Sequence, residues 1–168
     1  MKRIIIIAVL FMLLAAGCTH LSVGHLQKNP LHLNQAENLS MRYWDFQYVS
    51  TVENGRYAVT GIAYPKTNVM PGWGEWLHDF WLSVYLSDDR GMVLASDMKV
   101  YPTQKVDPEG VQFEFSMSPE RMPAARDIFV TFGYRMSLTE SRFRGPTYEK
   151  PLTGEQSVFF ASEGALAR

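Results

Sequence analysis

The chain has 168 residues, of which 46% are hydrophobic. This length and composition suit a single domain with a full hydrophobic core. The 16 Lys and Arg side chains nearly balance the 17 Asp and Glu side chains, for a net charge of −1, which excludes the basic surface that nucleic-acid binding requires. Cys18 is the one cysteine, so an internal disulfide and a thiolate metal site are excluded.

The first eighteen residues have the pattern of an export signal. Lys2 and Arg3 precede an apolar run, and three small residues at 15–17 stand directly before Cys18. The uncharged run of about 14 residues is shorter than the roughly 20 that span a membrane as a helix. An ordinary secretory signal is the other alternative, and it would make Cys18 incidental.

This pattern resembles the type II signal peptide of bacterial lipoproteins. The resemblance implies that residues 1–17 are a signal peptide removed before Cys18 and that the Cys18 thiol carries a diacylglycerol. In Gram-negative lipoproteins an Asp after the cysteine retains the protein in the inner membrane, and Thr19 stands here instead. The resemblance therefore implies an outer-membrane lipoprotein that faces the periplasm. Loss of Lys2 and Arg3 leaves 14 basic and 17 acidic side chains, a net charge of −3.

Residues 18–40 are mostly polar, and we predict that the lipidated Cys18 and the residues after it form a flexible tether. About 22 flexible residues have a root-mean-square reach of roughly 25 Å. The leucines of this stretch leave a second possibility open. Leu31, Leu33 and Leu39 would then form an irregular first strand or cover a sheet edge.

From residue 41 onward, short aromatic and β-branched stretches alternate with turn residues, a pattern typical of β-strands. Asn54 and Gly55 predict a hairpin turn between residues 44–48 and 57–64. Further strands are predicted over residues 80–86, 92–101, 111–117, 128–136 and 158–160. About seven strands within residues 41–160 favour an antiparallel immunoglobulin-like β-sandwich over a barrel. Residues 161–168 are small and polar, and we predict a disordered tail.

Residues 57–134 contain a second pattern. Gly61 lies in a strand, residues 80–86 form the next strand, a turn follows at 88–91, and Gly110 precedes Phe113 and Phe115. This arrangement resembles FxLYD-type domains, which are small immunoglobulin-like sandwiches of exported bacterial proteins without a known catalytic site. The resemblance implies a fold class and transfers no functional residue.

Most catalytic mechanisms need a general base or a metal ligand, and the predicted domain offers few candidates for either role. Three of the four histidines precede residue 41 and leave His78 alone in the domain, which excludes a multi-histidine metal site there. His78 and Asp79 are adjacent, so on a strand they point to opposite faces and cannot pair. We interpret His78 as a loop-end residue, and Asp88 and Asp89 as turn residues. No phosphate-binding loop and no nucleophile elbow occurs. We therefore predict no enzyme, no catalytic residue, no metal and no cofactor.

The segment over residues 70–78 contains Trp73 and Trp76 together with Pro71, Gly72 and Gly74, which predicts a loop. Exposed indoles stack on sugars or anchor a protein partner, so Trp73 and Trp76 are the candidate binding residues. The alternative is that one or both fold back and cap the core. Trp44 and Trp81 lie inside strand patterns, and we interpret them as structural.

The sequence thus predicts a non-enzymatic outer-membrane lipoprotein that acts as an accessory or assembly factor and binds another envelope protein. The alternative is a module that binds a glycan or peptidoglycan through Trp73 and Trp76. The basic residues Arg142, Arg144 and Lys150 precede the last strand, and contact with an anionic headgroup or polymer is left open for them.

Overall fold

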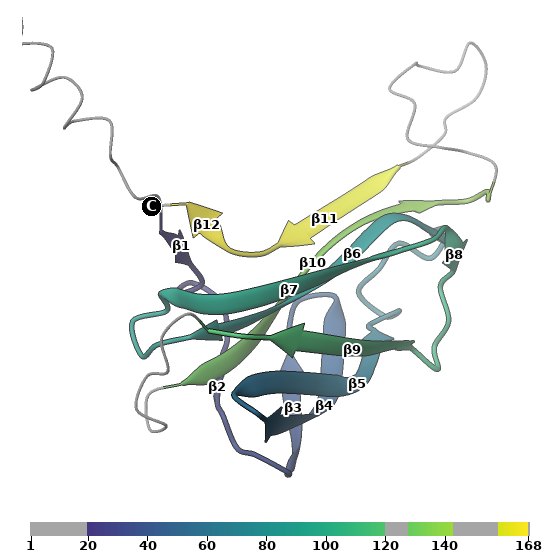
Figure 1. Ribbon diagram of the computed structural model, residues 1–168. Coiled ribbons are helices and arrows are strands. Elements are labelled where there is room, and N and C mark those ends of the chain that lie inside the picture. Colours follow the sequence, from purple (N-terminus) through teal and green to yellow (C-terminus); the bar gives the residue numbers. More distant parts are fainter. Residues whose placement is uncertain (1–19, 120–127, 143–157, 168) are drawn as a thin grey trace, which may run out of the picture.

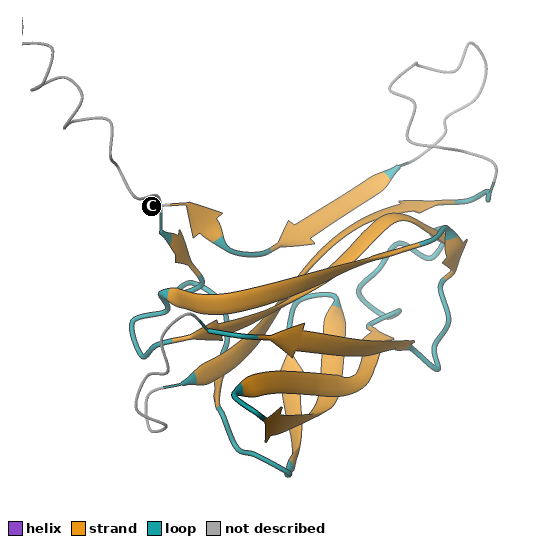
Figure 2. Ribbon diagram, in the orientation of Figure 1, coloured by secondary structure: helices purple, strands orange, loops and turns teal. Residues whose placement is uncertain are grey.

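A computed structural model of the protein describes residues 20–119, 128–142 and 158–167. Every regular element in these ranges is a β-strand, and the strands pair antiparallel in sheets that pack as a sandwich (Figures 1 and 2). The predicted all-β antiparallel sandwich is confirmed. In the described ranges no helical segment has the length and apolar character needed to span a bilayer.

The sandwich has two main sheets. The four-stranded sheet has the order β3 (Ala36–Ser40), β4 (Trp44–Glu53), β5 (Arg56–Pro65) and β9 (Val111–Met117). The six-stranded sheet has the central order β11 (Phe159–Glu163), β10 (Phe129–Thr139), β6 (Trp76–Ser87) and β7 (Val93–Tyr101), and short strands β2 (Asn29–Pro30) and β8 (Gln104–Lys105) pair with β10 and β6. A separate ribbon joins β1 (Leu21–Ser22) to β12 (Leu166–Ala167).

The strand order is that of an immunoglobulin-type sandwich. The neighbours β4, β5 and β9 correspond to strands A, B and E, and β11, β10, β6 and β7 correspond to G, F, C and C′. Strand β3 is added outside β4. The described residues hold eight strands of five residues or more, close to the seven that the sequence predicts.

The predicted hairpin and the predicted half-buried strand are both present. Asn54 and Gly55 have φ of 52° and 76° and connect Glu53 to its partner Arg56, as a two-residue turn with positive φ requires. In β9 the residues at 113, 115 and 117 are buried and those at 112, 114 and 116 are exposed. Local sequence chemistry therefore determines these two elements.

Aromatic rings join the two sheets at the centre of the core. Phe132 of β10 stacks on Phe46 of β4 with ring centroids 4.2 Å apart. Tyr48 and Phe113 meet the same Phe132 ring at 5.1 and 5.4 Å. Such pairs contribute about 0.5–1.5 kcal/mol each beyond the burial of their area, so Phe132 is central to the stability of the sandwich.

Tyr48 is a buried tyrosine in this core, 3% exposed. Burial raises its pKa from 10.0 to about 12; a hydrogen bond from Asn29 lowers the value, and the charge of Glu37 raises it. The amide Nδ2 of Asn29 donates to the Tyr48 hydroxyl at 3.3 Å. The fold therefore holds this phenol in its neutral form.

The structure corrects the prediction of a flexible tether over residues 20–40. Strand β3 pairs with β4 along its length, and Leu39 is 1% exposed. Val23 is fully buried, and Leu33 bridges to Ser50. Burial removes apolar surface of this segment from water, and a solvated tether would not gain that stabilisation. The strand alternative is confirmed for Leu39, which lies in β3, and Leu33 forms an isolated bridge, whereas Leu31 packs against the core outside any strand. Cys18 and the rest of residues 1–19 lie outside the described residues.

The predicted disordered tail is also wrong for residues 161–167. Strand β11 continues to Glu163, and β12 pairs with β1 at the other end of the chain. Ala161 is buried against the core cluster. Pairing with a strand distant in sequence orders a segment that has little local signal of its own.

Candidate functional site

A β-bulge in β6 determines which side chains reach the outer face of the six-stranded sheet. Trp81 pairs with Arg135, but the next recorded pair is His78 with Ser137. Strand β6 therefore carries one extra residue in this interval, which defines a bulge. Asp79 lies in the bulge with φ of 47°, a conformation that Asp tolerates better than most residues.

The bulge changes the alternation of β6. Leu77 and Phe80 are three positions apart, yet both are fully buried in the core. Trp76, His78 and Trp81 then share the opposite, outer face of the sheet. The structure thus brings Trp76 onto the same face as Trp81, a placement that a regular two-residue period does not predict.

Arg135 lies between two aromatic rings on this outer face. Its Cζ is 5.0 Å from the ring centroid of Trp81 and 5.4 Å from that of Phe160. Val100 pairs directly with Trp81, and Met98 lies two positions earlier on β7. Phe160, Val100 and Met98 are 56%, 62% and 50% exposed. We call these five side chains the Arg135 surface.

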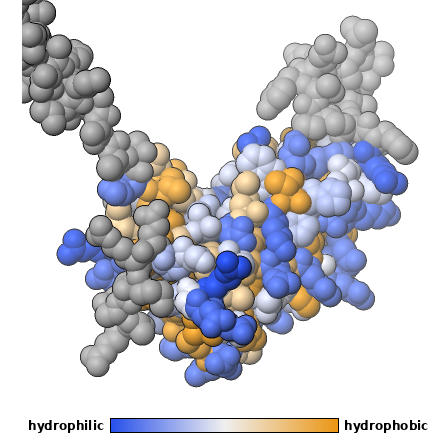
Figure 3. All heavy atoms as spheres, viewed as in Figure 1, coloured by the Kyte–Doolittle hydropathy of each residue, from blue (hydrophilic) through white to orange (hydrophobic). Residues whose placement is uncertain are grey.

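The guanidinium of Arg135 lies within cation–π distance of two rings and has no carboxylate partner among the described residues. The Arg135 side chain is exposed. Arginine over an aromatic face gains cation–π attraction and keeps its hydrogen-bond donors available. Figure 3 shows apolar residues interrupting an otherwise hydrophilic surface. The Arg135 surface therefore combines apolar area with an unpaired positive charge.

The two candidate tryptophans occupy different elements. Trp73 lies in the turn before β6, and Trp76 lies in β6 itself, so the predicted loop is wrong for Trp76. Both are half-buried. Lys105 Nζ is 5.9 Å and Arg142 Cζ is 5.8 Å from the Trp76 ring centroid. Arg144 and Lys150 lie outside the described residues.

A hollow of about 370 Å³ lies beside the turn that carries Trp73. It is lined by Thr67, Met70, Pro71, Gly72, Gly74, Glu75, Lys105 and Val106. Its volume lies within the range of small-ligand sites. Neither candidate tryptophan lines it, so the structure does not join Trp73 and Trp76 into one platform around this hollow.

His78 is not at a loop end, as the sequence suggested, but within β6 and 4% exposed. Its Nε2 lies 3.3 Å from the carbonyl oxygen of Ser141, and its Nδ1 lies 3.3 Å from the hydroxyl of Thr103. The carbonyl oxygen only accepts, so Nε2 donates to it, and in this tautomer of the neutral ring Nδ1 accepts from the Thr103 hydroxyl. Both ring nitrogens are therefore engaged in structural hydrogen bonds.

Several carboxylates of the described residues accept hydrogen bonds from backbone amides in turns and strands. Asp88 Oδ1 accepts from the amide of Met92 at 2.7 Å, and the Asp88 carbonyl accepts from the amide of Gly91. This confirms the predicted turn role of Asp88. Within residues 20–119, 128–142 and 158–167, no three His, Cys, Asp or Glu side chains gather in a way that could hold a metal ion.

A larger hollow, of about 660 Å³, lies between segments from both ends of the chain. His25 and Arg42 line it from the N-terminal part, and Glu163 and Leu166 line it from the C-terminal part. It carries charged groups of both signs. Sequence reasoning missed it because its walls become neighbours only through the pairing of distant strands.

Comparison with known proteins gave no match: no protein-family profile, no curated protein and no solved structure matches the chain. The resemblance to lipoprotein signal peptides and to FxLYD-type domains therefore stays a prediction from sequence, and the function rests on the surfaces described above.

Proposed function

We propose that the protein is a lipid-anchored outer-membrane protein, held by Cys18 and facing the periplasm, which binds another envelope protein through the Arg135 surface. In this role it acts without catalysis, as an accessory or assembly factor. One observation carries the proposal: Arg135 lies exposed between Trp81 and Phe160 with no carboxylate partner among the described residues. Aromatic residues, Met and Arg are the types enriched at the centres of protein interfaces.

The shape of the Arg135 surface favours a protein over a small ligand. Its side chains come from the outer face of neighbouring strands, with Val100, Trp81 and Arg135 paired side by side across β7, β6 and β10. An open sheet face suits a broad contact, whereas small-ligand sites are concave. The expected partner places a carboxylate against Arg135 and apolar side chains over Trp81 and Phe160. Anchoring at Cys18 raises the effective concentration of both partners, so a modest interface suffices.

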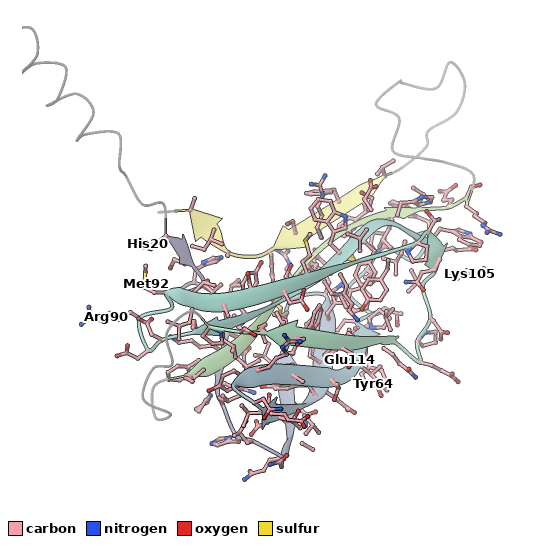
Figure 4. The ribbon with its side chains drawn as sticks, in the orientation of Figure 1. His20, Tyr64, Arg90, Met92, Lys105 and Glu114 are labelled. Atoms are coloured by element: carbon pink, nitrogen blue, oxygen red, sulfur yellow. The ribbon has the colours of Figure 1, made fainter. Side chains whose placement is uncertain are left out.

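The test is site-specific photo-crosslinking in cells with the full-length protein. A crosslinking residue at Val100 or at Phe160 should capture one dominant protein. Glu114 is the matched control, because it is exposed on the opposite sheet (Figure 4). Arg135→Ala should remove the adduct, and Cys18→Ala should weaken it.

Two outcomes would contradict the proposal. One is an adduct that forms equally from Glu114, which would indicate collision without a defined surface. The other is an adduct that persists unchanged in Arg135→Ala, which would remove the arginine from the interface.

A second function is favoured by the surroundings of Trp76. Its half-buried ring lies near the cations Lys105 and Arg142, an arrangement that suits stacking on a carbohydrate that carries carboxylates. Under this proposal the protein binds peptidoglycan or a surface polysaccharide through Trp73 and Trp76. Retention on purified sacculi should then be lost in the Trp73→Ala, Trp76→Ala double variant and kept in Trp81→Ala. Absent or unchanged retention rejects the glycan proposal.

A further inference from the structure

The first described strand lies very close to Cys18 in the sequence. Strand β1 starts at Leu21, three residues further along. An extended chain spans at most about 3.6 Å per residue, so Leu21 lies within about 11 Å of Cys18. A lipid on Cys18 would therefore hold β1 at the bilayer surface, in place of a domain that floats on a long tether. The inference below rests on the proposed lipidation of Cys18.

The element at this position is the ribbon of β1 and β12. Leu21 pairs with Ala167, and Ser22 pairs with Leu166. Leu21 is 43% exposed and Leu166 is 55% exposed. Figure 3 shows apolar residues over this end of the molecule, where Figure 1 places β1 and β12.

The ribbon is fixed to the sandwich. Ser22 is 1% exposed and bridges to Met92, and the amide of Val23 donates to the carbonyl of Gly91 at 2.8 Å. Position 91 also admits no side chain, because a Cβ on Gly91 would lie 2.4 Å from the Cα of Gly24. The orientation of the ribbon therefore sets the orientation of the whole domain.

The two leucines lie on opposite faces of the ribbon. Directly paired residues share a face, and Leu21 is offset by one position from the partner of Leu166. A flat protein interface would cover one of these faces. Ser22, on the face of Leu166, is 1% exposed, so this face is open only at Leu166 itself, and a fluid lipid phase can adapt to two leucines that lie on different sides of the ribbon.

We propose that the β1–β12 ribbon is a membrane-contact surface, with Leu21 and Leu166 inserted at the boundary of headgroups and acyl chains. Proteins at membrane surfaces bury apolar side chains to this shallow depth. The domain then stands with its β1–β12 end on the bilayer and its β8 end directed away.

The length of one strand gives the distance between the two ends of the domain. Figure 4 places His20, Arg90 and Met92 at one end of the molecule and Lys105 at the other. Strand β6 runs between these ends, from Trp76, which pairs with Lys105, to Ser87. Its 12 residues are separated by 11 intervals of about 3.3 Å, so the strand spans roughly 36 Å. Trp73 and Trp76 are therefore carried on the side away from the membrane.

The experiment uses the full-length lipidated protein in vesicles of phosphatidylethanolamine and phosphatidylglycerol that contain a phospholipid with a nitroxide on its headgroup. The nitroxide quenches a fluorophore only near contact. Single cysteines introduced at His20, Arg90 and Lys105 each carry the fluorophore, while Cys18 is blocked by its lipid. We expect strong quenching at His20 and Arg90 and none at Lys105.

Substitution of the leucines separates docking from anchoring. The Leu21→Asp, Leu166→Asp variant should lose the quenching at Arg90 and keep it at His20, because Cys18 still holds His20 near the bilayer. Val52→Asp is the matched control, since Val52 is 40% exposed in β4, and it should change nothing. Circular dichroism checks that each variant keeps its strands.

The two possible failures are distinguishable. Equal quenching at Arg90 and Lys105 overturns the docking inference and leaves the lipid anchor in place. No quenching at any position, His20 included, overturns the proposed anchoring at Cys18 and the inference with it.

Discussion

The close approach of β4 and β5 at Gly61 gives a sharp test of the fold. A Cβ at this position would lie 2.0 Å from the carbonyl oxygen of Gln47, 2.8 Å from the Cα of Tyr48 and 2.9 Å from the ring of Phe113. Two of these three atoms belong to the backbone of β4, which ladder hydrogen bonds hold in place. Gly61→Ala therefore cannot be accommodated by rotation of a flexible side chain.

The expected cost follows from the size of the overlap. Separations below 3.0 Å do not persist in folded proteins, so the two strands must move apart by about 1 Å. This displacement is larger than that of ordinary core overpacking, which costs about 1–3 kcal/mol. Lengthening one or two ladder hydrogen bonds adds about 1 kcal/mol each. We expect Gly61→Ala to lower the free energy of unfolding by about 4 kcal/mol. That loss corresponds to a fall in Tm of about 8–16 °C in a domain of this size.

The assay is urea unfolding followed by tryptophan fluorescence, with a thermal melt beside it. Gly72→Ala is the matched control, because a Cβ there would meet nothing within 4 Å. That control should leave stability unchanged or raise it by up to about 1 kcal/mol, through the lower entropy of the unfolded chain. A loss below about 1 kcal/mol in Gly61→Ala would refute the steric argument. An equal loss in both variants would show that the loss comes from replacing any glycine by alanine and not from the close approach at Gly61.

Three further predictions concern the core, the pH range and the surface. Phe132→Ala should lower the free energy of unfolding by about 4 kcal/mol, because a stacked and fully buried ring is removed, while Phe132→Leu should lose clearly less in the same urea titration. Burial raises the pKa of Tyr48 to about 12. The contribution of the neutral Tyr48 to the free energy of unfolding is therefore complete below pH 10 and is lost as the pH rises from 10 to 12. Tyr48→Phe should therefore lose less stability between about pH 9 and about pH 11.5 than the unchanged protein does, and an identical loss would contradict this. Arg135→Gln should change the free energy of unfolding by less than about 0.5 kcal/mol, since the guanidinium is exposed, yet abolish the crosslink from Phe160.

The sequence predicted elements whose signal is local. Asn54 and Gly55 specify a two-residue turn by their tolerance of positive φ, and the structure shows both with positive φ. The alternation around Phe113 and Phe115 specifies a strand with one buried face. Neither inference depends on what the rest of the chain does.

Elements whose own residues carry little strand signal, and which are ordered by pairing with another strand, were not predicted. Residues 36–40 form β3 because β4 offers them a free edge, and their composition alone resembles a solvated segment. Asn34, with φ of 59°, interrupts the alternation just before that strand. The spacing of Leu31, Leu33 and Leu39 was the available signal, and it favoured a strand only as an alternative.

The bulge at Asp79 explains why the surface residues were misjudged. A period-two pattern cannot locate an inserted residue, so Trp76 was assigned to a loop, while Trp81 was interpreted only as a structural residue of a strand. Trp81 is instead half-buried on the outer face against Arg135. A charged residue at position 135, within an otherwise apolar strand, was the sequence feature that marked this face.

The pairing of β1 with β12 also has a consequence for the order of events during biosynthesis. Leu21 lies near the start of the described chain and Leu166 near its end, yet their strands are hydrogen-bonded neighbours. Until β12 has been made, β1 can only bridge to Met92 through Ser22, and the cost of closing the long loop from β1 to β12 is offset only once the sheets between them have formed. Among the described strands, the ladder of β1 with β12 is thus completed only after the two main sheets, although β1 precedes both of them in the sequence.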